Sequence, residues 1–114
     1  MTNGCQVSIS KTGTRLIFRP GIIDANDGVE VRHDCDLGRN ITYYLEVICL
    51  LGIFGKTELN VVLTGNTDDN KDQSVDSFAR AFNFIINLCD APTASIKVNK
   101  RGFAPLGGGV VTLK

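Results

Sequence analysis

The sequence predicts an α/β protein, an α+β two-layer sandwich in which two helices cover one face of a mixed sheet. Segments 40–54 and 74–89 repeat apolar residues at helical spacing. Short apolar runs before, between and after them are typical of strands. The 114 residues, with 43% hydrophobic content, suit a single globular core. The predicted order is a β-hairpin followed by β-α-β-α-β-β.

The hairpin comes first, where "QVSIS" (6–10) and "RLIFR" (15–19) flank the turn "KTGT". Alternation places four apolar residues on one face: Val7, Ile9, Leu16 and Phe18. Pro20 and Gly21 end the second strand. No helix precedes this hairpin to cover it, and proteins normally cover a long unpaired edge. We therefore expect that the hairpin pairs with further protein, or that the chain lacks the protein that would cover it.

Four further strands are predicted after the hairpin. "DANDG" (24–28) predicts a turn, and residues 29–35 a strand whose alternation is weak. Residues 58–65 are mostly apolar, as in a strand covered on one or both faces. Two further strands, 95–100 and 109–114, lie on either side of a glycine-rich loop.

The helices carry capping signals. Asn40 is the expected N-cap of the first helix and Gly55 its C′ residue, while Ser74 is the expected N-cap of the second. Asp90 and Pro92 end the second helix. Its predicted apolar face holds Val75, Phe78, Ala79, Phe82, Ile85, Ile86 and Cys89.

The four cysteines, at positions 5, 35, 49 and 89, form no C-x-x-C pair and no zinc-site spacing. We expect them to be reduced and buried, as in a protein that stays inside the cell. The first ten residues lack the basic and apolar regions of a secretory signal. No apolar stretch approaches the ~20 residues of a membrane span, so no membrane partner is expected.

Twelve basic and twelve acidic residues give a formal charge of zero, so an RNA contact requires a local patch. Arg39 lies at the start of the first helix, where backbone N–H groups are free. With Lys100 and Arg101 it could form an anion patch, although a scattered basic surface fits equally well. Glu46 is expected on the flank of the same helix.

The stretch "KRGFAPLGGG" (100–109) is not a Walker A motif, since no lysine followed by Ser or Thr comes after the glycines. A strand follows it, so it lacks the helix dipole that phosphate loops use. A wide hairpin with a glycine bulge and a ligand-facing loop both remain open.

Two further segments favour structural interpretations. "TGNTDDNKDQSVD" (64–76) imitates an EF-hand loop, but Gln73 and Ala79 occupy the obligatory glycine and glutamate positions. We interpret it as a solvated loop with helix-capping residues. His33 adjoins Asp34 on a strand, where neighbours point to opposite faces, so it is expected at the surface. No metal site and no cofactor are predicted.

The motifs "RLIFRPG", "HDC", "ITYYLE", "LGIFGK", "TGNTDDNKDQSVD" and "KRGFAPLGGGVV" occur in the order found in the RNA 3'-terminal phosphate cyclase family. "YYLE" and "HDC" resemble its cyclase-like branch, the nucleolar ribosome-biogenesis proteins. The resemblance implies repeated βαβαββ modules, similar to the C-terminal domain of a bacterial translation initiation factor. Residues 1–23 would then be the end of one module and residues 24–114 a complete second module of a longer protein.

The resemblance also implies a cleft. In true cyclases the position of Glu46 is a glutamine lining the nucleotide pocket, and the proline matching Pro105 lies near it. Glu46 departs from this pattern, and a carboxylate there would repel phosphates. The adenylylated histidine of cyclases lies beyond Lys114, so no catalytic residue is expected. The residues expected to line the cleft or to contact RNA or a partner are Arg39, Glu46, Lys100, Arg101, Pro105, Gly107, Gly108 and Gly109.

Three functions follow as hypotheses. The first is a non-catalytic cyclase-like protein of the nucleolus that acts in small-subunit rRNA processing, for which the resemblance implies a ribosome-assembly GTPase, the pre-ribosomal particle and possible contact with rRNA. The second is a piece of a working cyclase, which converts an RNA 3'-phosphate to a 2',3'-cyclic phosphate with ATP. The third is an inert remnant.

Overall fold

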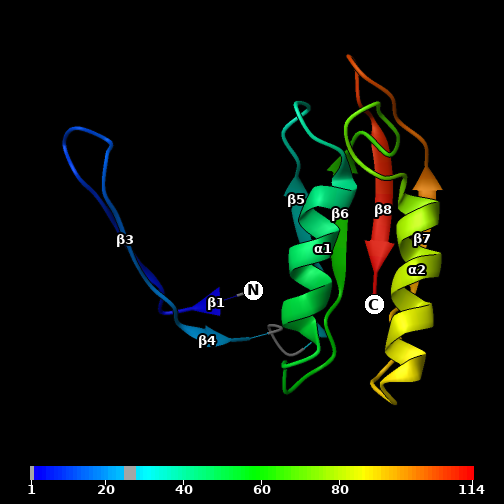
Figure 1. Ribbon diagram of the computed structural model, residues 1–114, viewed down its shortest axis with the longest axis horizontal. Helices are drawn as coiled ribbons and strands as arrows, with labels where there is room; N and C mark the ends of the chain where they lie inside the picture. The colour runs from blue at the N-terminus through cyan, green and yellow to red at the C-terminus, as the bar shows by residue number, and fades with distance from the viewer. Residues whose placement is uncertain (1, 25–27) are drawn as a thin grey trace.

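The structure is a computed structural model that describes residues 2–24 and 28–114 (Figure 1). The turn predicted for 24–28 falls largely on residues 25–27, which lie outside the described residues. The elements in chain order are β1 (Thr2–Asn3), β2 (Gln6–Ile9), β3 (Leu16–Arg19), β4 (Ile22–Ile23), β5 (Val31–Asp34), α1 (Ile41–Gly52), β6 (Val61–Gly65), α2 (Val75–Leu88), β7 (Ile96–Lys100) and β8 (Gly109–Leu113).

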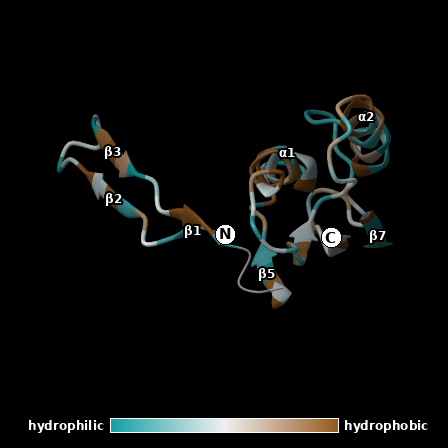
Figure 2. Ribbon diagram, turned by 90° about the horizontal axis from the view of Figure 1, so that it is seen from below, coloured by the Kyte–Doolittle hydropathy of each residue, from teal (hydrophilic) through white to brown (hydrophobic). Residues whose placement is uncertain are grey.

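The predicted two-layer sandwich is confirmed. A four-stranded sheet has the order β5-β6-β8-β7, with β5 parallel to β6 and the other neighbours antiparallel. Both helices lie on one face of this sheet (Figure 2). One cross-strand row on that face is apolar in all four strands and consists of Val31, Val61, Leu113 and Ile96.

The core lies between the helices and this sheet. Ile41 and Leu45 of α1, Leu63 of β6, Val75 of α2 and Val111 of β8 are completely buried. Alternate residues of β6 and β8 therefore point to the helices, as the pleat of a strand requires. Among the described residues, no helix is both long enough and apolar enough to cross a bilayer.

Both predicted N-caps are confirmed. The Asn40 side chain accepts a hydrogen bond from the backbone N–H of Thr42, and Ser74 accepts one from Ser77. The prediction for Gly55 is wrong, because α1 ends at Gly52 with Ile53 as its C-cap.

The predicted apolar face of α2 is wrong at two positions. Ile85 is 57% exposed, and Cys89 is the exposed C-cap of the helix. Asp90, at φ 51°, then takes the left-handed conformation that terminates α2.

The cysteine predictions are confirmed in part. All four thiols are free, and Cys35 and Cys49 are buried as expected, but Cys5 and Cys89 are exposed. Burial raises the pKa of the Cys49 thiol to about 12. Burial first, and the charge of Asp34 second, raise the pKa of Cys35 to about 11.

The N-terminal hairpin is confirmed, and it stands away from the helices and the four-stranded sheet (Figure 1). We call residues 2–23 the arm and residues 28–114 the body. The expected face is formed, since Val7 pairs with Phe18 and Ile9 with Leu16. All four of these side chains are more than half exposed. The arm continues into a second short pair, β1 with β4.

Candidate functional site

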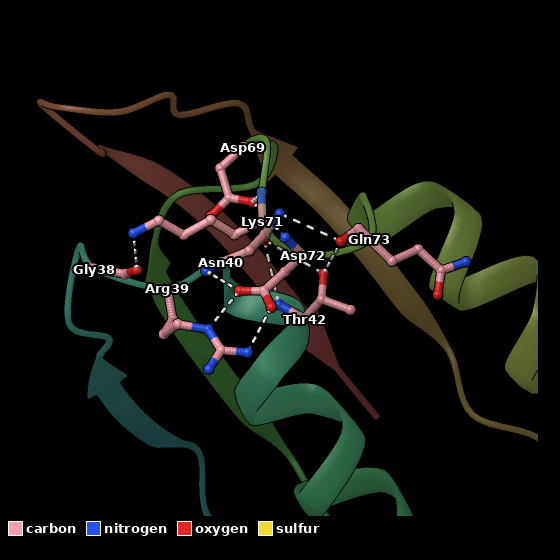
Figure 3. Close-up of polar contacts among 8 residues, drawn as sticks. All are labelled: Gly38, Arg39, Asn40, Thr42, Asp69, Lys71, Asp72 and Gln73. Atoms are coloured by element: carbon pink, nitrogen blue, oxygen red, sulfur yellow. Dashed lines mark hydrogen bonds and ion pairs between the residues drawn. The ribbon is translucent and has the colours of Figure 1, made fainter.

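Five parts of the body meet at one end of its sheet. The parallel strands β5 and β6 both end there, α1 and α2 begin there, and the loop between β7 and β8 closes over them. The segment 66–74, which we call the junction loop, contacts the residues between β5 and α1, the start of α1 and the loop between β7 and β8. Figure 3 shows its contacts with the start of α1. In open α/β sheets, ligands bind outside the carboxyl ends of the strands, which makes this end the candidate site.

Arg39 is held at the start of α1 by the junction loop. Its Nε donates to Asp72 Oδ2 at 2.8 Å and its Nη2 to Asp72 Oδ1 at 2.6 Å, a bidentate pair (Figure 3). Its guanidinium also lies over the ring of Tyr43, 3.9 Å from the centroid. The hydrogen bond from Arg39, followed by one from the backbone N–H of Asn40, lowers the pKa of Asp72 to about 2.

A second set of bonds ties the helix cap to the same loop. The Asn40 Nδ2 and the Thr42 hydroxyl both donate to the carbonyl of Gln73, at 3.3 and 2.7 Å (Figure 3). Lys71 Nζ donates to the Gly38 carbonyl at 3.1 Å. The start of α1 is thus positioned by polar contacts more than thirty residues away in the sequence.

Arg101 binds the other side of the junction loop. Its Nη1 lies 2.7 Å from Asp76 Oδ2 and 3.3 Å from Asp68 Oδ2. The hydrogen bond from Arg101 lowers the pKa of Asp76. Lys100, its neighbour at the end of β7, is exposed and makes no salt bridge with a described residue. Both arginines of the suggested anion patch are therefore engaged by carboxylates.

The glycine-rich loop packs closely against the junction loop. A Cβ on Gly109 would lie 2.7 Å from Thr67 Cγ2, and one on Gly102 would lie 2.0 Å from the backbone nitrogen of Gly109. Gly107 has φ +64°, and a Cβ there would meet Leu37 at 2.5 Å. The hairpin is wide, as one interpretation held, but its register shift falls between Val98 and Lys100 rather than at the glycines.

The other candidate residues lie apart from these contacts. Pro105, in a cis peptide bond with Ala104, and Gly108 are both exposed. Glu46 is also exposed, one turn and a half into α1. The structure thus brings four of the candidate residues around the junction loop: Arg39, Arg101, Gly107 and Gly109. The other four, Glu46, Lys100, Pro105 and Gly108, are exposed and make none of these contacts.

Sequence reasoning missed the junction loop itself. Its interpretation as solvated is wrong at Asn66 and Thr67, which are completely buried. Asn66 Nδ2 donates to the Leu37 carbonyl at 2.9 Å, while its Oδ1 is buried without a partner. Thr67 Oγ1 accepts from the N–H of Gly102 at 3.2 Å. The signal that could have found them is a polar pair directly after a buried strand.

His33 lies at the surface of β5, as predicted, with its ring centroid 5.7 Å from that of Tyr44. Across the described ranges 2–24 and 28–114, no group of three or more His, Cys, Asp or Glu residues could hold a metal ion.

The order β5-α1-β6-α2-β7-β8 of the body is that of a βαβαββ module. Comparison of the sequence with protein families agrees: residues 1–114 match the model of the RNA 3'-terminal phosphate cyclase family. The chain belongs to this family.

Curated relatives place it within the family. The chain is 44% identical over 115 residues to the "Probable RNA 3'-terminal phosphate cyclase-like protein" of Arabidopsis thaliana, covering 99% of this chain and 30% of the relative. It is 40% identical to the human "RNA 3'-terminal phosphate cyclase-like protein" and 40% identical to the "rRNA processing protein rcl1" of Schizosaccharomyces pombe, each over 97% of this chain and 30% of the relative. The chain thus spans about 30% of the length of these relatives.

Proposed function

We propose that this chain acts in rRNA processing as a non-catalytic, cyclase-like protein of the nucleolus that serves the small ribosomal subunit. The observation that carries the proposal is the identity of 34–44% to relatives named cyclase-like or rRNA processing protein, over nearly the whole chain. Its partners would be the pre-ribosomal particle and a ribosome-assembly GTPase, with rRNA as a further contact.

The local chemistry supports a non-catalytic role. His33, the one histidine of the chain, packs on Tyr44 rather than on a carboxylate or a nucleophile. Asp68, Asp72 and Asp76 pair with the two arginines beside the glycine-rich loop, so a nucleotide phosphate would have to compete with these carboxylates for each guanidinium. The end of the sheet is then a junction in which the two arginines already have carboxylate partners.

The arm would be the end of a preceding module, whose helices cover its apolar face. The support is internal: β7 and β8 also form a hairpin, and its apolar residues Val98 and Val111 lie under the body's helices. In a longer gene product, amide hydrogen exchange in β3 should be slower than in this 114-residue chain. Equal exchange rates in the two would contradict a covering module.

The function is tested by sedimentation. A tagged chain expressed in cells should co-sediment with pre-ribosomal particles and release from them when the particles are dissociated in EDTA. A tagged chain that stays at the top of the gradient would contradict the proposal.

The alternative function is a piece of an active cyclase, favoured by the family match itself. Incubation of a longer gene product that contains this chain with α-labelled ATP discriminates between the two, because a cyclase becomes covalently adenylylated. A labelled protein band would favour the enzyme, and an unlabelled band beside a labelled authentic cyclase would favour the scaffold.

A further inference from the structure

Positive charge without compensating negative charge is concentrated in the arm. Residues 1–23 hold Lys11, Arg15 and Arg19 and no Asp or Glu. The remaining residues therefore carry all 12 acidic residues and nine of the 12 basic ones, a net charge of −3 against +3 for this segment. A formal charge of zero for the whole chain conceals this separation.

The arm's cations also differ from three arginines of the body in their ion pairing. In the body, Arg32, Arg39 and Arg101 are each paired with a carboxylate. No salt bridge within the described part of the chain involves the three basic residues of the arm. All three lie on an exposed stretch that stands away from the body (Figure 1).

The basic residues lie on a defined face. The pairs Gln6 with Arg19 and Ser8 with Ile17 alternate with the apolar pairs of the hairpin, so Arg19 lies on the face opposite Phe18. Arg15 follows the same alternation and lies on the face of Arg19, about 13 Å away along the strand. The arm therefore has one apolar face and an opposite face, which we call the basic face, on which Arg15 and Arg19 lie on either side of Ile17.

The tip of the arm is structured. Ser10 N–H donates to the Arg15 carbonyl at 2.9 Å, and Arg15 N–H donates to Ser10 Oγ at 3.1 Å. The hydroxyls of Ser10, Thr12 and Thr14 form a chain of hydrogen bonds across the turn, at 3.3 and 2.8 Å. These bonds hold Lys11 and Arg15 close to the same turn and leave hydroxyl groups exposed beside them.

We propose that Arg15 and Arg19 on the basic face of the arm, together with Lys11 in the turn at its tip, bind the phosphate backbone of single-stranded RNA. Charge complementarity identifies a polyanion as the occupant, and the choice of RNA rests on the proposed function. A single strand suits this face, because an extended backbone can follow a flat ribbon without entering a groove. The apolar face opposite takes no part in this contact.

The test compares two variants of the full chain that have the same net charge. K11Q/R15Q/R19Q neutralises the arm, and K56Q/K97Q/K114Q neutralises three exposed body lysines that make no salt bridge with a described residue. Binding of a fluorescent 20-nucleotide oligouridylate is measured by anisotropy at 50 and 200 mM salt. Circular dichroism confirms that both variants fold.

The parent and the body variant should bind the oligouridylate, with three phosphate contacts weakening binding about 18-fold over this fourfold rise in salt. The arm variant should lose most of the affinity and most of that salt dependence. Equal losses in the two variants, or none in the arm variant, would overturn the assignment of RNA to the arm. Loss of binding to phosphatidylserine vesicles without loss of RNA binding would overturn it in favour of a membrane surface.

This test and that of the proposed function are separable. A chain that binds RNA through its arm but does not co-sediment with pre-ribosomal particles would contradict the proposed function alone. A chain that co-sediments while its arm variant binds the oligouridylate like the parent would contradict the RNA assignment alone.

Discussion

The arm and the body use the same apolar alternation and reach opposite outcomes. In the body, Leu63 and Val111 alternate with outward residues and are completely buried under two helices. In the arm, Ile9 and Leu16 form an equally regular face and are 65% and 64% exposed. An alternating pattern therefore determines which side chains share a face, while the covering layer has to come from elsewhere.

The two regions also treat charge differently. Two of the body's arginines are held in ion pairs that join separate segments, Arg39 with Asp72 and Arg101 with Asp76. The arm keeps three cations and no acidic side chain. Charge thus has a structural role in the body, whereas in the arm it is available to a partner.

The largest effect separating the two regions should come from apolar truncation. Leu63→Ala removes a completely buried side chain from the body and should lower the free energy of unfolding by about 3 kcal/mol. Leu16→Ala, in the exposed arm, should change it by less than about 0.5 kcal/mol. Urea denaturation followed by circular dichroism measures both. Similar losses would show that the arm packs on the rest of the molecule in solution.

Glycine substitutions should give the next largest difference. Gly102→Ala places a Cβ 2.0 Å from the backbone nitrogen of Gly109 and should cost about 3 kcal/mol, because two backbone segments must separate. Gly13→Ala meets no atom within 4 Å, and only its φ of +69° opposes the change. That strain, about 1 kcal/mol, should affect the arm's turn and leave the thermal transition of the body in place. A lowered body transition in Gly13→Ala would contradict this independence.

Local signals allowed the sequence to predict much of the body. Asn40 and Ser74 were predictable as N-caps, because a cap depends on a side chain and the N–H groups two or three residues later. The prediction for Gly55 was wrong because a glycine is a C′ residue only when the helix extends to the position before its C-cap, and α1 already ends at Gly52. Ile85 and Cys89 are exposed because the buried face of α2 is narrower than its apolar periodicity suggests.

The candidate site was less predictable because its contacts are distant in the sequence. Thr67 hydrogen-bonds to the carbonyl of Gly102, thirty-five residues later. Asp72 accepts a hydrogen bond from Arg39, thirty-three residues earlier. Spacing along the chain could indicate Arg39 and the glycine-rich loop as candidates. It could not show that carboxylates of the junction loop would occupy both arginines, since that depends on how the strands are ordered in the sheet.

Acid should destabilise the body through Asp72, while the arm holds no carboxylate side chain that could contribute. The pKa of Asp72 is about 2 in the folded protein, below its ordinary value of 3.8. Its contribution is therefore fully present above pH 3.8 and is lost as the pH falls through 2. Asp72→Asn should melt at a lower temperature at pH 7 and lose less on acidification than the parent. The control is Asp90→Asn, which changes an exposed carboxylate that forms no ion pair with a described residue. If the two variants behave alike, the Arg39 pair does not have this role.

Thiol labelling should distinguish the regions without changing stability. Cys5 in the arm and Cys89 at the end of α2 are exposed and should react promptly with a disulfide reagent at pH 8. Cys35 and Cys49 should react only after unfolding, because burial shields them and raises the pKa of their thiols to about 11 and about 12. Cys5→Ser should reduce the prompt reaction from two thiols to one. Protection of Cys5 that grows with protein concentration would instead mean that a second copy covers the arm, and the contrast between arm and body would hold only for the monomer.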